Sequence, residues 1–292
     1  MAKKRKPWFV KLFLWLFSIV LVLVLLLGGA CLFVKLKYDV SVFSTIAQVK
    51  VLNQEVNEDE LFKNKFSDDD MSEAKVKVDA NLNGLITGSK EEGFSVTPEH
   101  LESTISASIY LTDKQIGAMV QTYLKENPSF ATLNIGGNDV KIEIVQIKFD
   151  NIVEKSVDVN LVIKIDTTFL KNQMNSFPLS LFNGYIPKTL YISSTNTITK
   201  GENAFEYQVK SKEIKFNKLS ASDTASLLKT LNIAVKFGTS DELNEKIGKA
   251  FADTLIGSES AQDGMTYLLK SAGVKDFNFQ VFNDENCYVI KA

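Results

Sequence analysis

The sequence predicts an α+β protein: an N-terminal transmembrane helix, then an extracytoplasmic domain in which an antiparallel sheet packs on helices. Three observations support this fold class. Leu12 to Val34 is a run of 23 residues without a charge. Through much of 140–219, apolar residues alternate with polar ones, as in strands with one face in water. Residues 220–273 instead have the three- and four-residue spacing of amphipathic helices.

The apolar run is long enough to cross a bilayer, since a helix of this length covers roughly 34 Å and the hydrocarbon core is about 30 Å thick. Five basic residues precede the run and two follow it. The positive-inside rule therefore predicts a single-pass protein of the cell membrane with a cytoplasmic N-terminus and an extracellular C-terminal domain. The predicted segments are a basic cytoplasmic tail (1–11), a transmembrane helix (12–34), a partly helical stalk (35–72) and an extracytoplasmic α+β domain (73–292).

Two alternatives to an uncleaved anchor stay open. Gly28, Gly29 and Ala30 supply the small residues of a signal-peptide cleavage site, but the apolar run continues past them. Together with Cys31 they also resemble a bacterial lipobox, whose cysteine is acylated after cleavage. Gly28 occupies the place where that motif has a large aliphatic residue, so we favour the uncleaved signal-anchor.

The first elements of the domain are short. Three acidic residues after Ser67 indicate a solvated helix start or loop rather than a calcium loop, and the alternation of Lys75 to Asp79 predicts a strand. Thr97-Pro98 is either a helix start or a turn before a strand at 105–111. Thr112 and Gln115 form a capping box that predicts a helix over 113–126.

Strands are predicted next, and helices follow them. In 140–149 the apolar parity slips by one residue, which predicts a bulge. A cleanly alternating strand at 157–165 and a pair at 190–192 and 205–209, joined near Lys200-Gly201, continue the sheet. Helices are then predicted to open near Ser222, Ser240 and Ser260, and a final hairpin is expected at 277–290.

Composition restricts the partners of the predicted domain. Seven of the 33 Lys and Arg residues lie in the first 38 residues, so 26 remain against 35 Asp and Glu, a net charge of −9. Such an acidic domain is not expected to bind nucleic acid, which requires clustered cations. Arg5 is the single arginine of the sequence and both tryptophans precede residue 16, so the domain has no arginine clamp and no tryptophan stacking platform.

The sequence gives little sign of catalysis. Cys31 lies in the apolar run and Cys287 in a predicted buried strand, so neither a disulfide nor a metal-binding cysteine pair is expected. His100 is the single histidine, and an exposed residue at a helix start is a better interpretation than a general base. Pairs of Ser and Lys, or of Asp and Glu, are too abundant to be informative. We therefore expect no enzyme, no cofactor and no metal.

One stretch, 169–187, is rich in large apolar residues but fits neither a helical nor a strand period. The plainer interpretation is a loop or short helix that caps the core. The alternative is an apolar lip beside a cavity for an acyl chain, or a surface that touches the bilayer. The candidate ligand-binding residues of this lip are Phe169, Leu170, Met174, Phe177, Leu179, Leu181, Phe182, Tyr185 and Ile186.

The segment Ile109-Tyr-Leu-Thr-Asp-Lys-Gln-Ile116, a strand that runs into a capped helix, resembles the start of TULIP-like lipid-binding modules. The order of anchor, strand, helix and long sheet resembles single-pass envelope proteins of Gram-positive bacteria, of the YpmS type. The resemblance covers about residues 95–220. It implies a curved antiparallel sheet that wraps a helix and encloses an apolar groove.

Two functions are compatible with these predictions. The first is a membrane-anchored extracytoplasmic binding protein for a lipid or other apolar envelope molecule, held in the concavity of the sheet. The alternative is a non-enzymatic accessory or scaffolding subunit of a cell-envelope complex, with an envelope protein as its partner. An empty apolar cavity under the sheet would favour the first function, and a filled core would favour the second.

Overall fold

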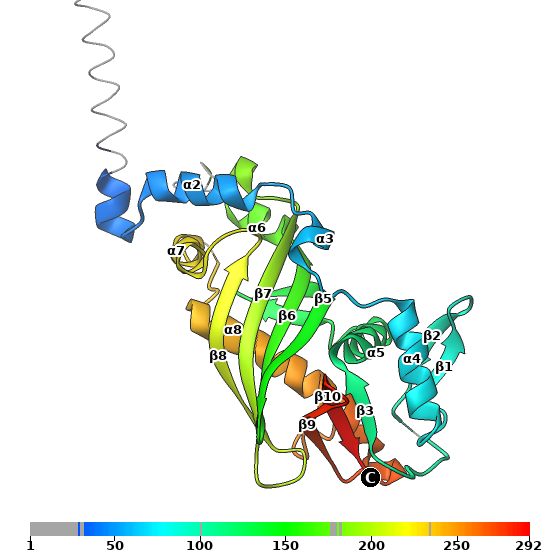
Figure 1. Ribbon diagram of the computed structural model, residues 1–292. Coiled ribbons are helices and arrows are strands. Elements are labelled where there is room, and N and C mark those ends of the chain that lie inside the picture. The colour runs from blue at the N-terminus through cyan, green and yellow to red at the C-terminus, as the bar shows by residue number, and fades with distance from the viewer. Residues whose placement is uncertain (1–28, 30–31, 100, 176–179, 181–182, 234) are drawn as a thin grey trace, which may run out of the picture.

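The structure is a computed structural model, and it describes residues 29, 32–99, 101–175, 180, 183–233 and 235–292 (Figure 1). Most of the predicted transmembrane helix at 12–34 therefore lies outside the described residues, as does His100. Among the residues that are described, no helix combines the length and the apolar character needed to cross a membrane.

A five-stranded antiparallel sheet forms the centre of the molecule and curves into a half-barrel that packs on helices (Figure 1). This confirms the α+β class and the curved antiparallel sheet. Its order follows the chain, because each strand pairs with the next through a short connection or, between β6 and β7, through the segment 167–188. The strands are β4 (Thr132–Ile135), β5 (Asn138–Val153), β6 (Ser156–Asp166), β7 (Thr189–Lys200) and β8 (Tyr207–Phe216).

Alternation along the strands gives the sheet one apolar face and one polar face. On β6, Val159, Leu161 and Ile163 are buried on the face that we call the inner face, and the residues between them lie on the outer face. The inner face packs against α8 (Ser240–Leu255) and α5 (Asp113–Glu126). The predicted bulge is confirmed, since the β5–β6 register shifts between Ile144 and Gln146.

Helix α5 has the predicted bounds and the predicted cap. The Thr112 hydroxyl accepts from the backbone N–H of Gln115 at 3.4 Å, and the Gln115 side chain accepts from the backbone N–H of Thr112 at 3.1 Å. These bonds satisfy two backbone donors that a helix start otherwise leaves free. The side chains of Ile116, Met119 and Val120 are then buried.

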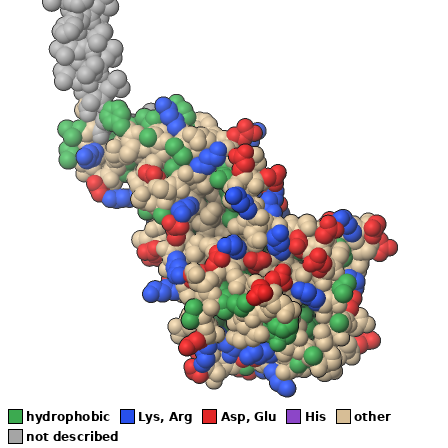
Figure 2. Space-filling model, in the orientation of Figure 1, with side chains coloured by type: hydrophobic (Ala, Val, Ile, Leu, Met, Phe, Trp, Pro, Cys, Tyr) green, Lys and Arg blue, Asp and Glu red, His purple; other side chains and the backbone are tan. Residues whose placement is uncertain are grey.

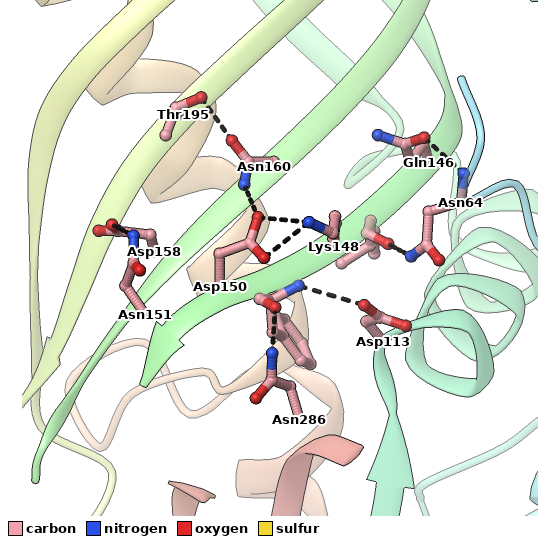
Figure 3. A network of polar contacts seen from close by, with 12 residues as sticks. Asn64, Asp113, Gln146, Lys148, Asp150, Asn151, Asp158, Asn160, Thr195 and Asn286 are labelled. Atoms are coloured by element: carbon pink, nitrogen blue, oxygen red, sulfur yellow. Dashed lines mark hydrogen bonds and ion pairs between the residues drawn. The ribbon is translucent and has the colours of Figure 1, made fainter. Parts of the chain in front are cut away.

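A second, three-stranded sheet has the order β3 (Ile109–Thr112), β10 (Glu285–Lys291), β9 (Asp276–Phe282). The predicted C-terminal hairpin is confirmed, with Asn283 and Asp284 both at positive φ in a two-residue turn that suits those residue types. Cys287 is buried in β10, as predicted for a strand residue. The backbone of Phe149 in β5 is bonded to the second sheet and to α5: Asn286 of β10 donates to the Phe149 carbonyl at 2.7 Å, and Asp113 of α5 accepts from the Phe149 N–H at 3.3 Å (Figure 3).

The strand predicted at 75–79 is wrong, because these residues form the end of α4 (Asp68–Asp79). Ser67 and Asp70 cap this helix reciprocally, which confirms the helix start. A two-residue alternation and a helical spacing coincide here, and burial of Met71, Ala74 and Val78 against α5 favours the helix.

Thr97-Pro98 begins no helix and follows the hairpin of β1 (Ile86–Ser89) and β2 (Gly93–Val96).

The segment predicted as a stalk contains α2 (Val42–Leu52) and α3 (Glu58–Leu61). Both helices contact the rest of the domain rather than extend from it. Val49 and Leu52 are buried, and α2 packs against α7 (Ala221–Leu231).

Further helices lie between and after the strands. Helix α6 (Thr168–Gln173) and the 3-10 turn Asn183–Tyr185 lie in the connection from β6 to β7, at the end of the sheet beside α2 (Figure 1). Of the three predicted C-terminal helices, α7 and α8 are regular. The third is reduced to α9 (Met265–Leu268) and the 3-10 turn Leu269–Ala272.

Candidate functional site

The inner face of the sheet is filled with side chains. Residues of α5, α8 and the strands interdigitate there and leave a cavity of about 10 Å³, close to the volume that a single water needs. An acyl chain does not fit this space. The cavity is lined by Val120, Leu124, Phe130, Leu133, Ile142, Ile144, Leu161, Ile163, Ile247, Ala250, Phe251 and Thr254.

A buried polar cluster fixes α8 to the strands. Asn244 accepts from the Ser194 hydroxyl at 2.7 Å and donates to the Thr195 carbonyl and to Ser211 Oγ, both at 2.9 Å. Asn196 donates to Ser194 Oγ at 2.8 Å. Because buried polar groups are costly unless paired, this cluster specifies one position of the helix on the sheet.

The outer face of the same strands carries an open groove of about 430 Å³. Its lining combines the apolar residues Leu61, Phe62, Leu161 and Val162 with polar residues from four strands. The register places the polar side chains side by side: Asn160 lies opposite Thr195, and Thr195 lies opposite Glu213. The residues whose polar side chains line it are Gln146, Lys148, Asp150, Asn160, Ser193, Thr195, Glu213, Lys215 and Asn217.

A chain of hydrogen bonds orients the floor of the groove (Figure 3). The Thr195 hydroxyl donates to Asn160 Oδ1 at 2.7 Å, and Asn160 Nδ2 donates to Asp150 at 2.8 Å. Lys148 donates to both oxygens of Asp150, at 2.7 and 2.9 Å. These contacts hold the side chains in place while leaving acceptors and donors toward solvent, an arrangement suited to a hydrogen-bonding ligand.

Asp158 adds a nearly buried carboxylate beside the groove. It accepts from Asn151 at 2.9 Å and Thr197 at 2.8 Å, and it forms an ion pair with Lys212. Burial acts to raise the pKa of Asp158, but the hydrogen bonds from Lys212, Asn151 and Thr197 outweigh it and leave the pKa below its usual value.

Residues 58–65 cover one end of the outer face. Phe62 packs in a small apolar cluster with Val145, Val162 and Tyr191. Asn64 donates to the Ile147 carbonyl at 2.7 Å (Figure 3). This cover closes the groove on the side of α3 and leaves the rest of the outer face open.

A second open cleft, of about 580 Å³, lies between the start of β8 and the end of α8. Tyr207 donates to Asp253 there, and Asp263 lines the same cleft. Burial, together with the negative charge of Asp253, raises the pKa of Asp263. In the part of the chain that the structure describes, no cluster of three or more His, Cys, Asp or Glu side chains could hold a metal.

The predicted apolar lip divides into core and surface residues. Leu170, Met174 and Ile186 are buried in the main core, Phe169 packs partly against it, and Tyr185 is exposed. The remaining candidates lie outside the described residues: Phe177, Leu179, Leu181 and Phe182.

Our interpretation of the sequence missed the groove on the outer face. Its signal was available in β6, where the residues between the apolar ones are Asp158, Asn160, Val162 and Lys164. This pattern shows a water-facing strand surface but not which residues of other strands lie beside it. The register of β5, β7 and β8 supplies that information.

No family model matches this chain, and no curated protein or solved structure matches it either. The resemblance to TULIP-like modules and to YpmS-type proteins therefore rests on the short segment at 109–116 and on the order of elements alone.

Proposed function

We propose that this protein is a membrane-anchored, non-enzymatic accessory subunit that binds an envelope protein through the groove on the outer face of its sheet. The observation that carries the proposal is the contrast between the two faces. The inner face has a residual cavity of about 10 Å³, and the outer face has a polar groove of about 430 Å³.

The chemistry of the groove favours a polar protein surface over a glycan. Glycan sites usually offer an exposed aromatic ring for stacking, whereas Phe62, the aromatic residue at this groove, is buried. Lys148 and Lys215 alternate with Asp150 and Glu213, so both signs of charge are presented. Such a pattern selects a partner with a complementary arrangement of charges rather than one of high net charge.

Lipid binding in the concavity was the other predicted function. The inner face is filled by side chains, so it does not support a lipid bound in the concavity of the sheet. A different lipid contact is proposed below: the end of the sheet that carries α2 and α6 would contact the bilayer surface rather than bind a single lipid molecule.

The test is photo-crosslinking of the full chain in native membranes, with a benzophenone amino acid at Ser193 in the groove. The matched control places it at Glu92, an exposed residue of the β1–β2 turn. We expect one discrete crosslinked partner from Ser193, and its loss when Lys148→Glu reverses a charge of the groove. Equal crosslinking from both positions, or insensitivity to Lys148→Glu with the fold intact by circular dichroism, would contradict the proposal.

A further inference from the structure

The end of the predicted membrane span packs into the body of the protein. Val34, its final residue, is 1% exposed and belongs to the main hydrophobic core. Residues 32–38 are helical, and α2 then runs across the end of that helix (Figure 1). A residue that ends a membrane span lies at the boundary between lipid and water. The part of the body that buries Val34 must therefore lie at this boundary too.

Large apolar side chains are exposed at this same end. Leu36 is 78% exposed and Phe43 is 75% exposed, and Leu32 and Phe33 are also exposed. Figure 2 shows hydrophobic side chains gathered at the upper end of the molecule, over residues 32–38 and α2. Burial of such side chains away from water is favourable, so their grouping indicates a surface that is covered by something apolar.

The solvent-facing side of α2 has the composition of an interfacial helix. Phe43, Ala47 and Lys50 lie on it at helical spacing, and Val42 and Val49 are buried on the opposite side. No acidic residue occurs in the sequence from 40 to 54, although the domain as a whole is acidic. An exposed phenylalanine together with a lysine in the last turn, and no acid within the helix, suits a helix that lies in the headgroup layer.

Lys37, which follows the predicted membrane span, lies against aromatic side chains. Lys37 Nζ lies 5.4 Å from the ring centre of Phe33 and 5.2 Å from that of Tyr38. The ammonium group thus lies over two aromatic rings, which keeps this charge at the apolar end of the molecule. Lys35 lines an adjoining groove of about 460 Å³, where Lys229 forms an ion pair with Asp39.

The connection between β6 and β7 lies beside α2 (Figure 1) and adds Tyr185, which is 47% exposed. Tyrosine is enriched where membranes meet water. We propose that α2 and the turn Asn183–Tyr185 rest on the outer leaflet of the bilayer, so that the body is held against the membrane rather than on a stalk. This inference rests on the proposed membrane anchor.

The test uses the full chain in vesicles of phosphatidylcholine and phosphatidylglycerol, in a background with Cys31→Ser and Cys287→Ala. A polarity-sensitive fluorophore is attached to a single cysteine, introduced as Phe43→Cys or Tyr185→Cys. The control is Val153→Cys, because Val153 is 61% exposed and lies at the opposite end of β5. A spin-labelled headgroup lipid quenches fluorophores near the bilayer surface.

Quenching at positions 43 and 185 should exceed that at position 153 by at least about threefold, as expected for side chains in the headgroup layer. Flotation of the vesicles is measured on the same samples. Protein that floats but shows equal quenching at all three positions would overturn the bilayer contact alone. Protein that does not float would overturn the membrane anchor, and the contact with it.

Discussion

Asn217 Nδ2 donates to the carbonyl oxygen of Leu52 at 2.6 Å, and this bond ties the end of α2 to the end of the central sheet. The same amide accepts from the backbone N–H of Tyr191 at 2.8 Å. One side chain thus satisfies a helix-terminal carbonyl and a strand-end donor, both of which would otherwise lack partners. The helix proposed to rest on the membrane is thereby coupled to the strands that form the groove.

Replacement of Asn217 by Leu should destabilise the domain. Leucine leaves the Leu52 carbonyl and the Tyr191 N–H unpaired, which costs roughly 1–3 kcal/mol for each buried group. Chemical denaturation of the full chain in detergent measures the free energy of unfolding. Gln208→Leu, which removes an exposed amide from β8, the strand that Asn217 follows, is the control and should change stability by less than about 0.5 kcal/mol. Equal effects of the two substitutions would show that the Asn217 bonds contribute nothing.

Replacement of Gly248 by Ala should destabilise the domain although alanine favours helices. A Cβ at Gly248 would lie 2.5 Å from Cγ of Asn196, inside the buried polar cluster. The clash should cost about 1–3 kcal/mol, which exceeds the gain of about 1 kcal/mol in helix propensity. Thermal unfolding checks this, with Lys249→Ala on the exposed side of α8 as the control. A raised melting temperature for Gly248→Ala would contradict this prediction, because it would mean that the side chains of the polar cluster rearrange to accept the Cβ without cost.

Asp158 should make stability sensitive to acid. Its folded pKa lies below the ordinary value of 3.8, so its contribution is present above that value and is lost as pH falls through the folded pKa. Asp158→Asn should lower stability at pH 7 by roughly 1–3 kcal/mol, since hydrogen bonds to a charged group are lost. The difference from the parent should shrink below about pH 4. Denaturation across this pH range would contradict the assignment if the difference stayed constant.

Asp263 should have the opposite dependence. Its folded pKa is raised by burial and by the charge of Asp253, so the folded state binds this proton more tightly than the unfolded state does. Ionisation at neutral pH therefore costs stability, and Asp263→Asn should be more stable than the parent at pH 7. The gain should be below about 1 kcal/mol and should vanish in acid. Glu92→Gln, which removes a carboxylate from an exposed turn, is the matched control, and denaturation at pH 7 and in acid compares the two variants with the parent.

Elements whose signals are local could be predicted from the amino-acid sequence. The capping box of Thr112 and Gln115 and the alternation of 157–165 predict α5 and β6, because a cap and a hydrophobic period act within a few residues. The parity slip near Ile144 predicts the bulge for the same reason. The apolar run at 12–34 is equally local, and its span remains a prediction.

Tertiary structure decided what depends on neighbours distant in sequence. Lys75 to Asp79 has two possible periods, and contact with α5 selects the helix. The groove joins Lys148 to Lys215 only because four strands pair in one register, which no local pattern contains. Likewise, Asn244 bonds α8 to its strand partners, and α8 fills the inner face of the sheet. The inner face is therefore closed, and the outer face open, because of packing between segments far apart in the sequence.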